Sequence, residues 1–245
     1  MKKYNIEDVC FFDTETTGVP PRGANWETDY MDFPFVVQLA WSVGGKQRSE
    51  IILPEGWEIP EDVAAIHGIT TERAMAEGKP FEEVISEFLD DAFNAPLVCA
   101  HNIYFDTSII KAGILRKFGT GVVFDKAEIA LYKGKRIDTM NKTVRFVGAR
   151  FANGRPGKFP KLEELYAKLF NGETFPAHDA FEDVKALKRC LPPLVEMGLI
   201  VLEPKQYEAA QPPTVKIEVE DTAPIELPKA TGMNKAAELL NQNDF

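Results

Sequence analysis

The decapeptide VCFFDTETTG, residues 9–18, decides the fold class. Four apolar residues in a row, Val9 to Phe12, favour a buried β-strand, and the run ends at an acidic residue. Asp13 and Glu15 stand two positions apart, so on a strand both carboxylates project from the same face. Two anions buried side by side are costly unless a cation neutralises them. The stretch therefore predicts a strand of an α/β domain that presents paired carboxylates to a cation.

Strand and helix patterns follow one another along the first 202 residues. Further strands are expected at 35–43 and 47–53, joined by the turn-forming pair Gly44-Gly45, and at 97–100 and 136–138. Helices are expected over 60–67, 70–77, 81–93, 103–118, 161–170 and 180–197. Residues 19–34, with three prolines and no clear period, predict an irregular insertion. This order predicts a three-layer α/β fold, with a mixed central sheet flanked by helices.

The composition excludes several classes of protein. Hydrophobic residues at 44% and charged residues at 27% are typical of a globular chain, and no apolar run approaches the roughly 18 residues of a membrane span. The three cysteines are odd in number and far apart, which argues against a disulfide framework or a zinc site. The first residues turn acidic where a signal peptide needs an apolar core, so we expect a cytoplasmic protein.

Positive charge is concentrated in the middle of an acidic chain. The formal net charge is −10, yet residues 111–168 contain 14 Lys and Arg against 5 Asp and Glu. This distribution indicates a surface that meets a polyanion, with ordinary solvated charges as the alternative. Within it, residues 145–159 interleave Arg and Lys with Phe, which offers cations for phosphates and rings for the bases of a single strand, core packing being the alternative for the rings.

Two more acidic clusters follow strands. In the motifs HNIYFD (101–106) and HDAFED (178–183), a residue that can cap a helix stands four positions before an aspartate: Asn102 before Asp106, and Asp179 before Asp183. Glu182 completes a capping-box pattern with Asp179. Acids in a first turn also complement the helix dipole. Their repetition beside a paired-carboxylate strand favours one shared cation site, and oxygen ligands favour Mg²⁺ or Mn²⁺.

These motifs resemble those of the DnaQ-like 3′–5′ exonucleases of the DEDDh class, the group that includes the proofreading epsilon subunit of bacterial DNA polymerase III. Asp13 and Glu15 match the first motif, Asp106 the second, and His178 and Asp183 the third. The match covers roughly residues 8–198, and the stretch IHGIT further resembles the epsilon-like branch rather than oligoribonucleases. The resemblance implies a ribonuclease H-like fold, which agrees with the layers expected above.

The resemblance also implies roles for individual residues. Asp13, Glu15, Asp106 and Asp183 would hold two Mg²⁺ or Mn²⁺ ions, with Asp13 bridging them, and His178 would be the general base for the attacking water. The expected substrate-binding residues are Thr16 and Thr17, whose amides would hold the 3′-hydroxyl, His67 in the nucleotide pocket, Phe105 as a wedge against the terminal bases or a core aromatic, and Arg150 and Arg155 of the basic segment.

The expected function is a metal-dependent 3′–5′ exonuclease that releases nucleoside 5′-monophosphates from single-stranded or frayed DNA, in proofreading or repair. An RNA-trimming exonuclease of the same fold and a catalytically silent nucleic-acid-binding adaptor are the alternatives. Residues 1–202 would form the exonuclease domain, and the proline-containing 203–245 an extended linker and tail. In that tail, Val215, Ile217 and Val219 alternate as an added edge strand would. The final ELLNQNDF resembles a docking motif for a sliding clamp or DNA polymerase, a frayed terminus being the alternative.

Overall fold

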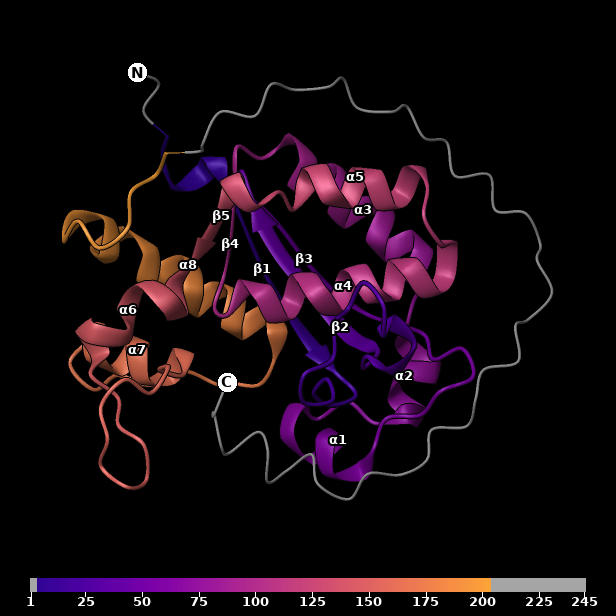
Figure 1. Ribbon diagram of the computed structural model, residues 1–245, viewed down its shortest axis with the longest axis horizontal. Helices are drawn as coiled ribbons and strands as arrows, with labels where there is room; N and C mark the ends of the chain where they lie inside the picture. The colour runs from indigo at the N-terminus through magenta and orange to yellow at the C-terminus, as the bar shows by residue number, and fades with distance from the viewer. Residues whose placement is uncertain (1–3, 204–245) are drawn as a thin grey trace.

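Five strands form one mixed sheet in the computed structural model, which describes residues 4–203 apart from the side chain of Lys133 (Figure 1). The strand order is β3-β2-β1-β4-β5. An antiparallel set consists of β1 (Val9–Thr16), β2 (Val36–Val43) and β3 (Lys46–Ile51). β4 (Leu97–Ala100) runs parallel to β1, and β5 (Arg136–Asp138) runs parallel to β4. β1 is the central strand of the five, so residues at its carboxyl end have a neighbouring strand on either side.

Helices cover both faces of the sheet (Figure 1). One face is covered by α3 (Phe81–Asn94), α4 (Ile103–Phe118) and α5 (Val122–Ala130), and the other by α7 (Leu162–Leu169) and α8 (Ala180–Glu196), with α6 (Thr139–Val147) beside α7. Two short helices, α1 (Glu61–His67) and α2 (Thr71–Glu77), lie where β1 ends. Three 3₁₀ turns complete the described chain: η1 (Ile6–Asp8), η2 (Tyr30–Asp32) and η3 (Lys133–Lys135).

The apolar run of β1 is buried because its side chains contribute to two hydrophobic cores, one on each face of the sheet. Cys10 and Phe12 pack into the core under α3, α4 and α5, whereas Val9 and Phe11 pack into the core under α7 and α8. All four side chains are fully buried. A strand buried on both faces needs a continuous apolar sequence rather than an alternating one, which explains why the run of four apolar residues located this strand.

The expected three-layer α/β fold is confirmed, and the expected helices and strands are present with boundaries shifted by a few residues. Two helices were missed. α5 follows the glycine-rich turn at Gly119 and Gly121, and α6 contains four β-branched residues that lower helix propensity. Asp138 nevertheless caps α6, because its side chain accepts the amide hydrogen of Asn141. No helix in residues 4–203 is long and apolar enough to cross a membrane.

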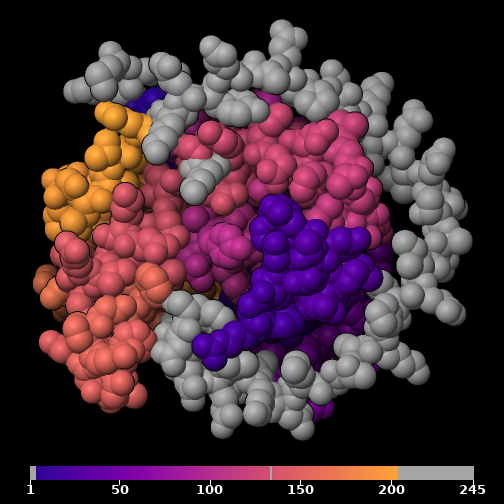
Figure 2. Space-filling model, in the orientation of Figure 1, coloured from indigo at the N-terminus to yellow at the C-terminus, as the bar shows by residue number. Residues whose placement is uncertain are grey.

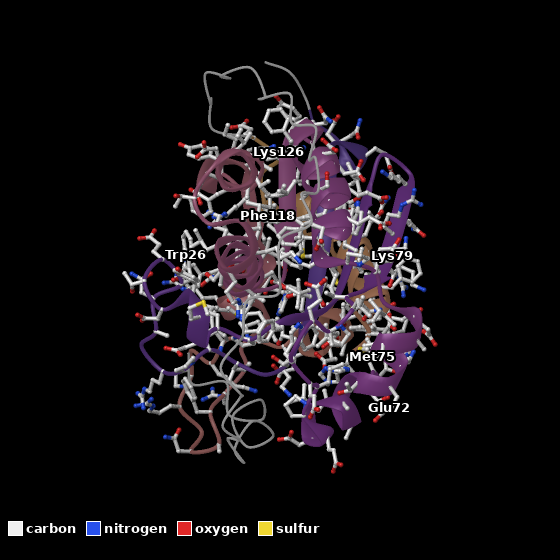
Figure 3. The ribbon with its side chains drawn as sticks, turned by 90° about the vertical axis from the view of Figure 1, so that its right-hand side faces the viewer. Trp26, Glu72, Met75, Lys79, Phe118 and Lys126 are labelled. Atoms are coloured by element: carbon white, nitrogen blue, oxygen red, sulfur yellow. The ribbon has the colours of Figure 1, made fainter. Side chains whose placement is uncertain are left out.

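The irregular insertion between β1 and β2 is anchored to the domain. Its two ends are joined by Thr17, whose amide donates to the Phe35 carbonyl and whose hydroxyl accepts the Phe35 amide hydrogen. Arg116 of α4 donates to the carbonyls of Phe33 and Pro34. Trp26 lies beside α4 and α5 (Figure 3), with Nζ of Lys111 5.0 Å from its ring centroid. These contacts make the insertion a fixed part of the surface, visible in indigo in Figure 2.

Candidate active site

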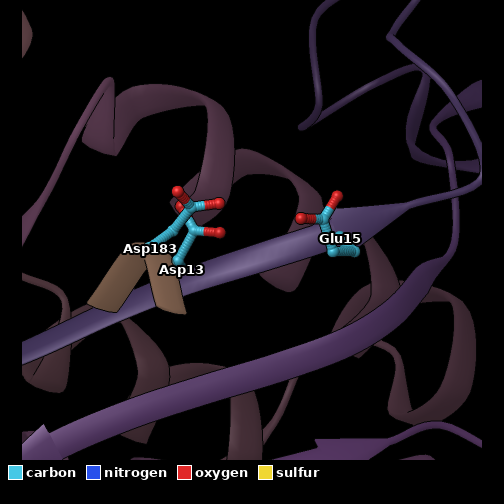
Figure 4. A group of neighbouring side chains, drawn as sticks. All are labelled: Asp13, Glu15 and Asp183. Atoms are coloured by element: carbon cyan, nitrogen blue, oxygen red, sulfur yellow. The ribbon is translucent and has the colours of Figure 1, made fainter. Parts of the chain in front are cut away.

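β1 and the first turn of α8 bring three carboxylates together (Figure 4). Asp13, Glu15 and Asp183 each offer a carboxylate oxygen, and these oxygens lie within 4.8 Å of one another. Asp13 and Glu15 project from the same face of β1, as their spacing predicts. Asp183 lies 168 positions after Glu15 in the sequence. The two sequence motifs therefore form one site only after the domain has folded.

The start of α8 is positioned by its own cap and by a residue of the sheet. Asp179 accepts the amide hydrogens of Phe181 and Glu182, as expected of an N-cap. The expected reciprocal capping-box bond is not recorded within residues 4–203, where the Glu182 carboxylate instead accepts a hydrogen bond from Lys185. Gln38 of β2, which pairs with Glu15 in the sheet, accepts the Ala180 amide hydrogen at 3.2 Å. Gln38 therefore ties the helix that carries Asp183 to the strands that carry the other carboxylates.

Asp106 approaches the same strand end from α4. Its Oδ1 accepts two hydrogen bonds from Thr14, from the amide at 3.1 Å and from the hydroxyl at 2.8 Å. Asn102 occupies the N-cap position of α4, but its side chain makes no capping bond, which corrects the expectation. The residue adopts a left-handed conformation (φ 71°) that asparagine tolerates better than most residues. The turn places Asp106 in the first helical turn by backbone geometry instead.

Burial raises the pKa values of the carboxylates at this strand end. The pKa of Asp13 lies well above its ordinary value because of burial and then the charge of Asp106. Burial, followed by the charge of Asp183, raises the pKa of Glu15 to about 8. The pKa values of Asp106 and Asp183 rise to about 7, again chiefly through burial.

This donor set fits a divalent cation. Within residues 4–203, no lysine or arginine forms an ion pair with Asp13, Glu15, Asp106 or Asp183. Asp106 is buried and the other three are partly buried, and carboxylates in such surroundings without a cationic side chain are stabilised when a metal ion supplies the missing positive charge. The donors are all oxygen atoms, the ligands that Mg²⁺ and Mn²⁺ prefer.

His178 stands on the loop just before α8. Its amide donates to Oδ2 of Asp183 at 3.1 Å, and its backbone has a left-handed φ of 67°. The side chain is about half exposed, and its Nε2 lies 3.7 Å from Oε1 of Glu163 in α7. The structure therefore places the expected general base next to the carboxylate cluster, with an acidic side chain beside it.

His67 and Thr16 are buried near the end of β1, whereas Thr17 is engaged elsewhere. Nδ1 of His67 accepts the Ile69 amide hydrogen at 3.1 Å, and the ring also interacts with the backbone of Thr16. Burial lowers the pKa of His67 to about 4, so the ring is neutral. The Thr17 amide was expected to hold a 3′-hydroxyl, but it donates to the Phe35 carbonyl that closes the insertion.

The remaining expected substrate contacts lie on α4 and on the loop between α6 and α7. Phe105 is half-buried and packs against the core under α4, whereas its neighbour Tyr104 is 61% exposed. Arg150 and Arg155 are exposed on the loop that projects between α6 and α7 (Figure 1). Arg150 donates to the Gly154 carbonyl, and the guanidinium of Arg155 lies 5.2 Å from the centroid of the Phe151 ring.

The basic segment is only partly a free surface. Several of its cations serve the fold by binding carbonyls or acidic side chains of other elements: Lys111, Arg116, Lys117, Lys126, Lys135 and Arg136. Exposed cations of the segment gather on α6, α7 and their connecting loop: Lys142, Arg145, Arg150, Arg155 and Lys168. We name residues 139–169 the basic arm. The interleaved rings are likewise divided, because Phe146 packs against the core under α8.

Two residues of the site were not expected from the sequence. Gln38 is the polar interruption in the apolar strand FVVQLAW, and that interruption is a signal that could have identified it. Glu163 is one of two consecutive glutamates at the start of a helix, where acids are common. Nothing in the sequence distinguishes it from Glu164, so its place beside His178 emerges only from the packing of α7 on α8.

No protein-family model matches the chain, and no curated protein matches it. The fold does match solved structures of exonuclease I. A moderately thermophilic exonuclease I from Methylocaldum szegediense aligns with a TM-score of 0.56 and 20% identity over 77% of this chain and 40% of that one. Exonuclease I of E. coli in complex with a dA16 oligonucleotide gives the same four values. A product-bound exonuclease I gives 0.57 and 21%, over 78% and 44%.

These similarities agree with the expected ribonuclease H-like fold. At about 20% identity they show a shared fold, and the chain spans about two fifths of the length of the exonuclease I chains that it matches. The expected epsilon-like branch stays a prediction, because these structures are of exonuclease I.

Proposed function

We propose that the protein is a metal-dependent 3′–5′ exonuclease that acts on single-stranded or frayed DNA and releases nucleoside 5′-monophosphates. One observation carries the proposal: Asp13, Glu15 and Asp183 converge at the end of β1, where Thr14 also holds Asp106. A purely structural role for such a group is costly, because buried like charges repel one another. The shared fold adds support, since the E. coli exonuclease I structures contain dA16 and dT13 oligonucleotides.

The proposed cofactors are two Mg²⁺ or Mn²⁺ ions held by Asp13, Glu15, Asp106 and Asp183. When bound, such ions activate a water molecule and stabilise the leaving 3′-oxygen. A zinc-bound form of the E. coli exonuclease I complex with single-stranded DNA supports a divalent ion at this fold. His178 would take the proton of the attacking water, because a histidine beside the carboxylate cluster is the side chain most often used as a general base.

His67 and the basic arm are the proposed substrate contacts. Because Nδ1 of His67 accepts the Ile69 amide hydrogen, the proton of the neutral ring resides on Nε2. That N–H is buried beside the backbone of Thr16 at the end of β1, where we propose that it also meets an oxygen of the terminal nucleotide. Arg150 and Arg155 would bind phosphates of the strand further from the scissile bond. Among the other expected contacts, Thr16 is proposed to line the 3′-hydroxyl pocket and Phe105 to support the terminal base.

A direct test compares matched single-stranded DNA, duplex DNA and RNA oligonucleotides labelled at either end, in Mg²⁺ and in excess chelator. We expect 5′-labelled single-stranded DNA to shorten stepwise in Mg²⁺, and the chelator to stop the reaction. Preferential digestion of RNA would favour the exoribonuclease alternative. Full activity in excess chelator, or an intact substrate under all conditions, would contradict the proposed function. We also propose a role in proofreading or repair. Docking of the tail on a clamp or polymerase is a further proposal, and the tail lies outside the described residues.

A further inference from the structure

Glu163 is an acidic side chain of α7 that faces His178 across the α7–α8 contact. Its Oε1 lies 3.7 Å from Nε2 of the imidazole. The Glu163 side chain is 38% exposed and that of His178 is 50% exposed, so packing alone fixes neither of them. The separation exceeds a hydrogen bond, and catalytic hydrogen bonds are often long before substrate binds. A small rotation of either side chain would bring the two groups into contact.

The adjacent glutamate has a different and purely structural task. Glu164 accepts the Lys161 amide hydrogen at 2.8 Å and lies 3.4 Å from Nζ of Lys158, so it caps the start of α7. In residues 4–203, the structure records no other ion pair for Glu163 than the one with His178. Two glutamates in the same helical turn are therefore divided between capping the helix and facing the histidine.

We propose that Glu163 is a positioning residue, which orients the His178 imidazole beside the carboxylate cluster and influences the reaction only through His178. The inference rests on the proposed function. His178 stands on a loop with a left-handed backbone, and its amide is bound to Asp183, so its backbone is fixed while its ring is exposed. A carboxylate beside an imidazole fixes the orientation of the ring.

A competing explanation is that Glu163 acts on the cation site directly by its charge. Burial is the main cause of the raised pKa of Asp183, and the negative charge of Glu163 is the next largest cause. The two carboxylates are therefore near one another. If charge alone mattered, removal of Glu163 would change cation affinity whether or not His178 is present. A role through His178 makes the opposite prediction, and a double-mutant cycle separates the two.

The experiment measures kcat and KM on a single-stranded oligonucleotide for Glu163→Gln, His178→Ala and the double variant, with Glu164→Gln as the matched control. We expect Glu163→Gln to lower kcat by roughly 10–100-fold at similar KM, and to have no further effect in the His178→Ala background. Glu164→Gln should keep the wild-type kcat, because glutamine also serves at this capping position. An unchanged kcat in Glu163→Gln, or the same loss in both backgrounds, would overturn the proposal.

A second measurement does not depend on activity. The chain has three histidines, so the imidazole signals of His67, His101 and His178 can be assigned by NMR from single substitutions. Glu163→Gln should shift the ring signals of His178 and leave the other two in place, while Mn²⁺ affinity measured by calorimetry stays within twofold. Unshifted His178 signals would refute the contact. A wild-type protein without nuclease activity would instead refute the proposed function, a distinct result from an active enzyme that is indifferent to Glu163.

Discussion

Thr14 holds Asp106 with both its backbone amide and its hydroxyl, at 3.1 and 2.8 Å from the same carboxylate oxygen. Thr14 is the residue between Asp13 and Glu15, so the strand that carries two acids of the site also fixes a third from α4. Hydrogen bonds to the charged form of a carboxylate favour that form and oppose the effect of burial. Thr14 therefore lowers the pKa of Asp106, against the effect of burial, as well as separating Asp13 from Glu15.

Thr14→Val is expected to lower nuclease activity or cation affinity by roughly 10–100-fold, because outer partners of metal ligands typically contribute this much. Valine keeps the shape and the β-branched character of the strand residue and removes only the hydroxyl. Thr107→Val is the matched control, since that buried hydroxyl bonds to the carbonyls of Ile103 and Tyr104 within its own helix. Activity assays and Mn²⁺ calorimetry would decide. Equal activity of the two variants would mean that the amide alone suffices to hold Asp106.

Local patterns predicted the elements of the fold well, because the apolar runs and caps that define them are contiguous in the sequence. The site was predicted less completely, because its decisive bonds join distant residues. Thr14 and Asp106 are 92 positions apart, and Gln38 and Ala180 are 142 apart. Asn102 was expected to cap α4, but its backbone is left-handed and its side chain makes no capping bond. The charge pattern likewise could not reveal that Lys111 forms an ion pair with Glu128 of α5 and that Arg116 donates to a carbonyl of the insertion.

Without metal, the stability of the protein should fall as the pH rises from about 6 to about 8. The pKa of Glu15 is raised by burial from 4.5 to about 8, so in this range the folded state binds more protons than the unfolded state. Raising the pH then favours unfolding, by about 1.4 kcal/mol per pH unit for each group that titrates. Urea denaturation in chelator would measure the slope.

The same experiment with Glu15→Gln should give a flatter slope and a higher stability at pH 8, because the buried charge is gone. Glu87→Gln serves as a control at an exposed carboxylate 3.6 Å from Arg48, and it should leave the slope as in the wild type. Saturating Mn²⁺ should stabilise the wild type most at high pH, where the carboxylates are ionised. A wild-type stability that increases with pH between 6 and 8 in chelator would contradict the raised pKa values.

His178→Ala should lower kcat by roughly 10²–10⁴-fold, the usual contribution of a general base. The side chain is half exposed and belongs to neither core, so the melting temperature should change little. His101 provides the contrast, because its ring nitrogens bind the Thr139 hydroxyl and the Pro160 carbonyl inside the domain. His101→Ala should lower the melting temperature while folded protein keeps its activity. A near-normal rate for His178→Ala would place the base on another residue.

Truncation after Leu202 should preserve the fold and the nuclease rate on short oligonucleotides. Leu202 packs against the core under α8 and is the last residue of the described chain that does so. The predicted boundary between the domain (1–202) and the tail (203–245) falls directly after it. The tail proposals, a strand from Val215 to Val219 and a docking motif at the terminus, lie outside the described residues. A pull-down with a sliding clamp, using full-length and truncated protein, tests the docking. Unfolding of the truncated protein would show that the boundary at residue 202 is wrong.

Reversing two charges of the basic arm should weaken substrate binding and reduce its salt dependence. Arg150 and Arg155 are exposed on the loop between α6 and α7, and a cross-strand bridge from Arg150 to Pro156 shapes that loop. The arm lies on the same face of the molecule as the insertion (Figure 2). Each phosphate contact with a single strand contributes roughly 0.7 to the slope of log K against log salt.

The double variant Arg150→Glu/Arg155→Glu should therefore raise KM for oligonucleotides and lower this slope by roughly 1.4 if each arginine neutralises one phosphate. The control Arg48→Glu/Lys79→Glu makes the same change in net charge elsewhere, at β3 and before α3, where both cations face glutamates of the domain. Lys79 is seen at the side of the molecule in Figure 3, on the β3 side of the domain. KM measured at several salt concentrations compares the two variants. If both change the slope equally, net charge rather than the arm governs binding, because a local contact surface must respond to position as well as to charge.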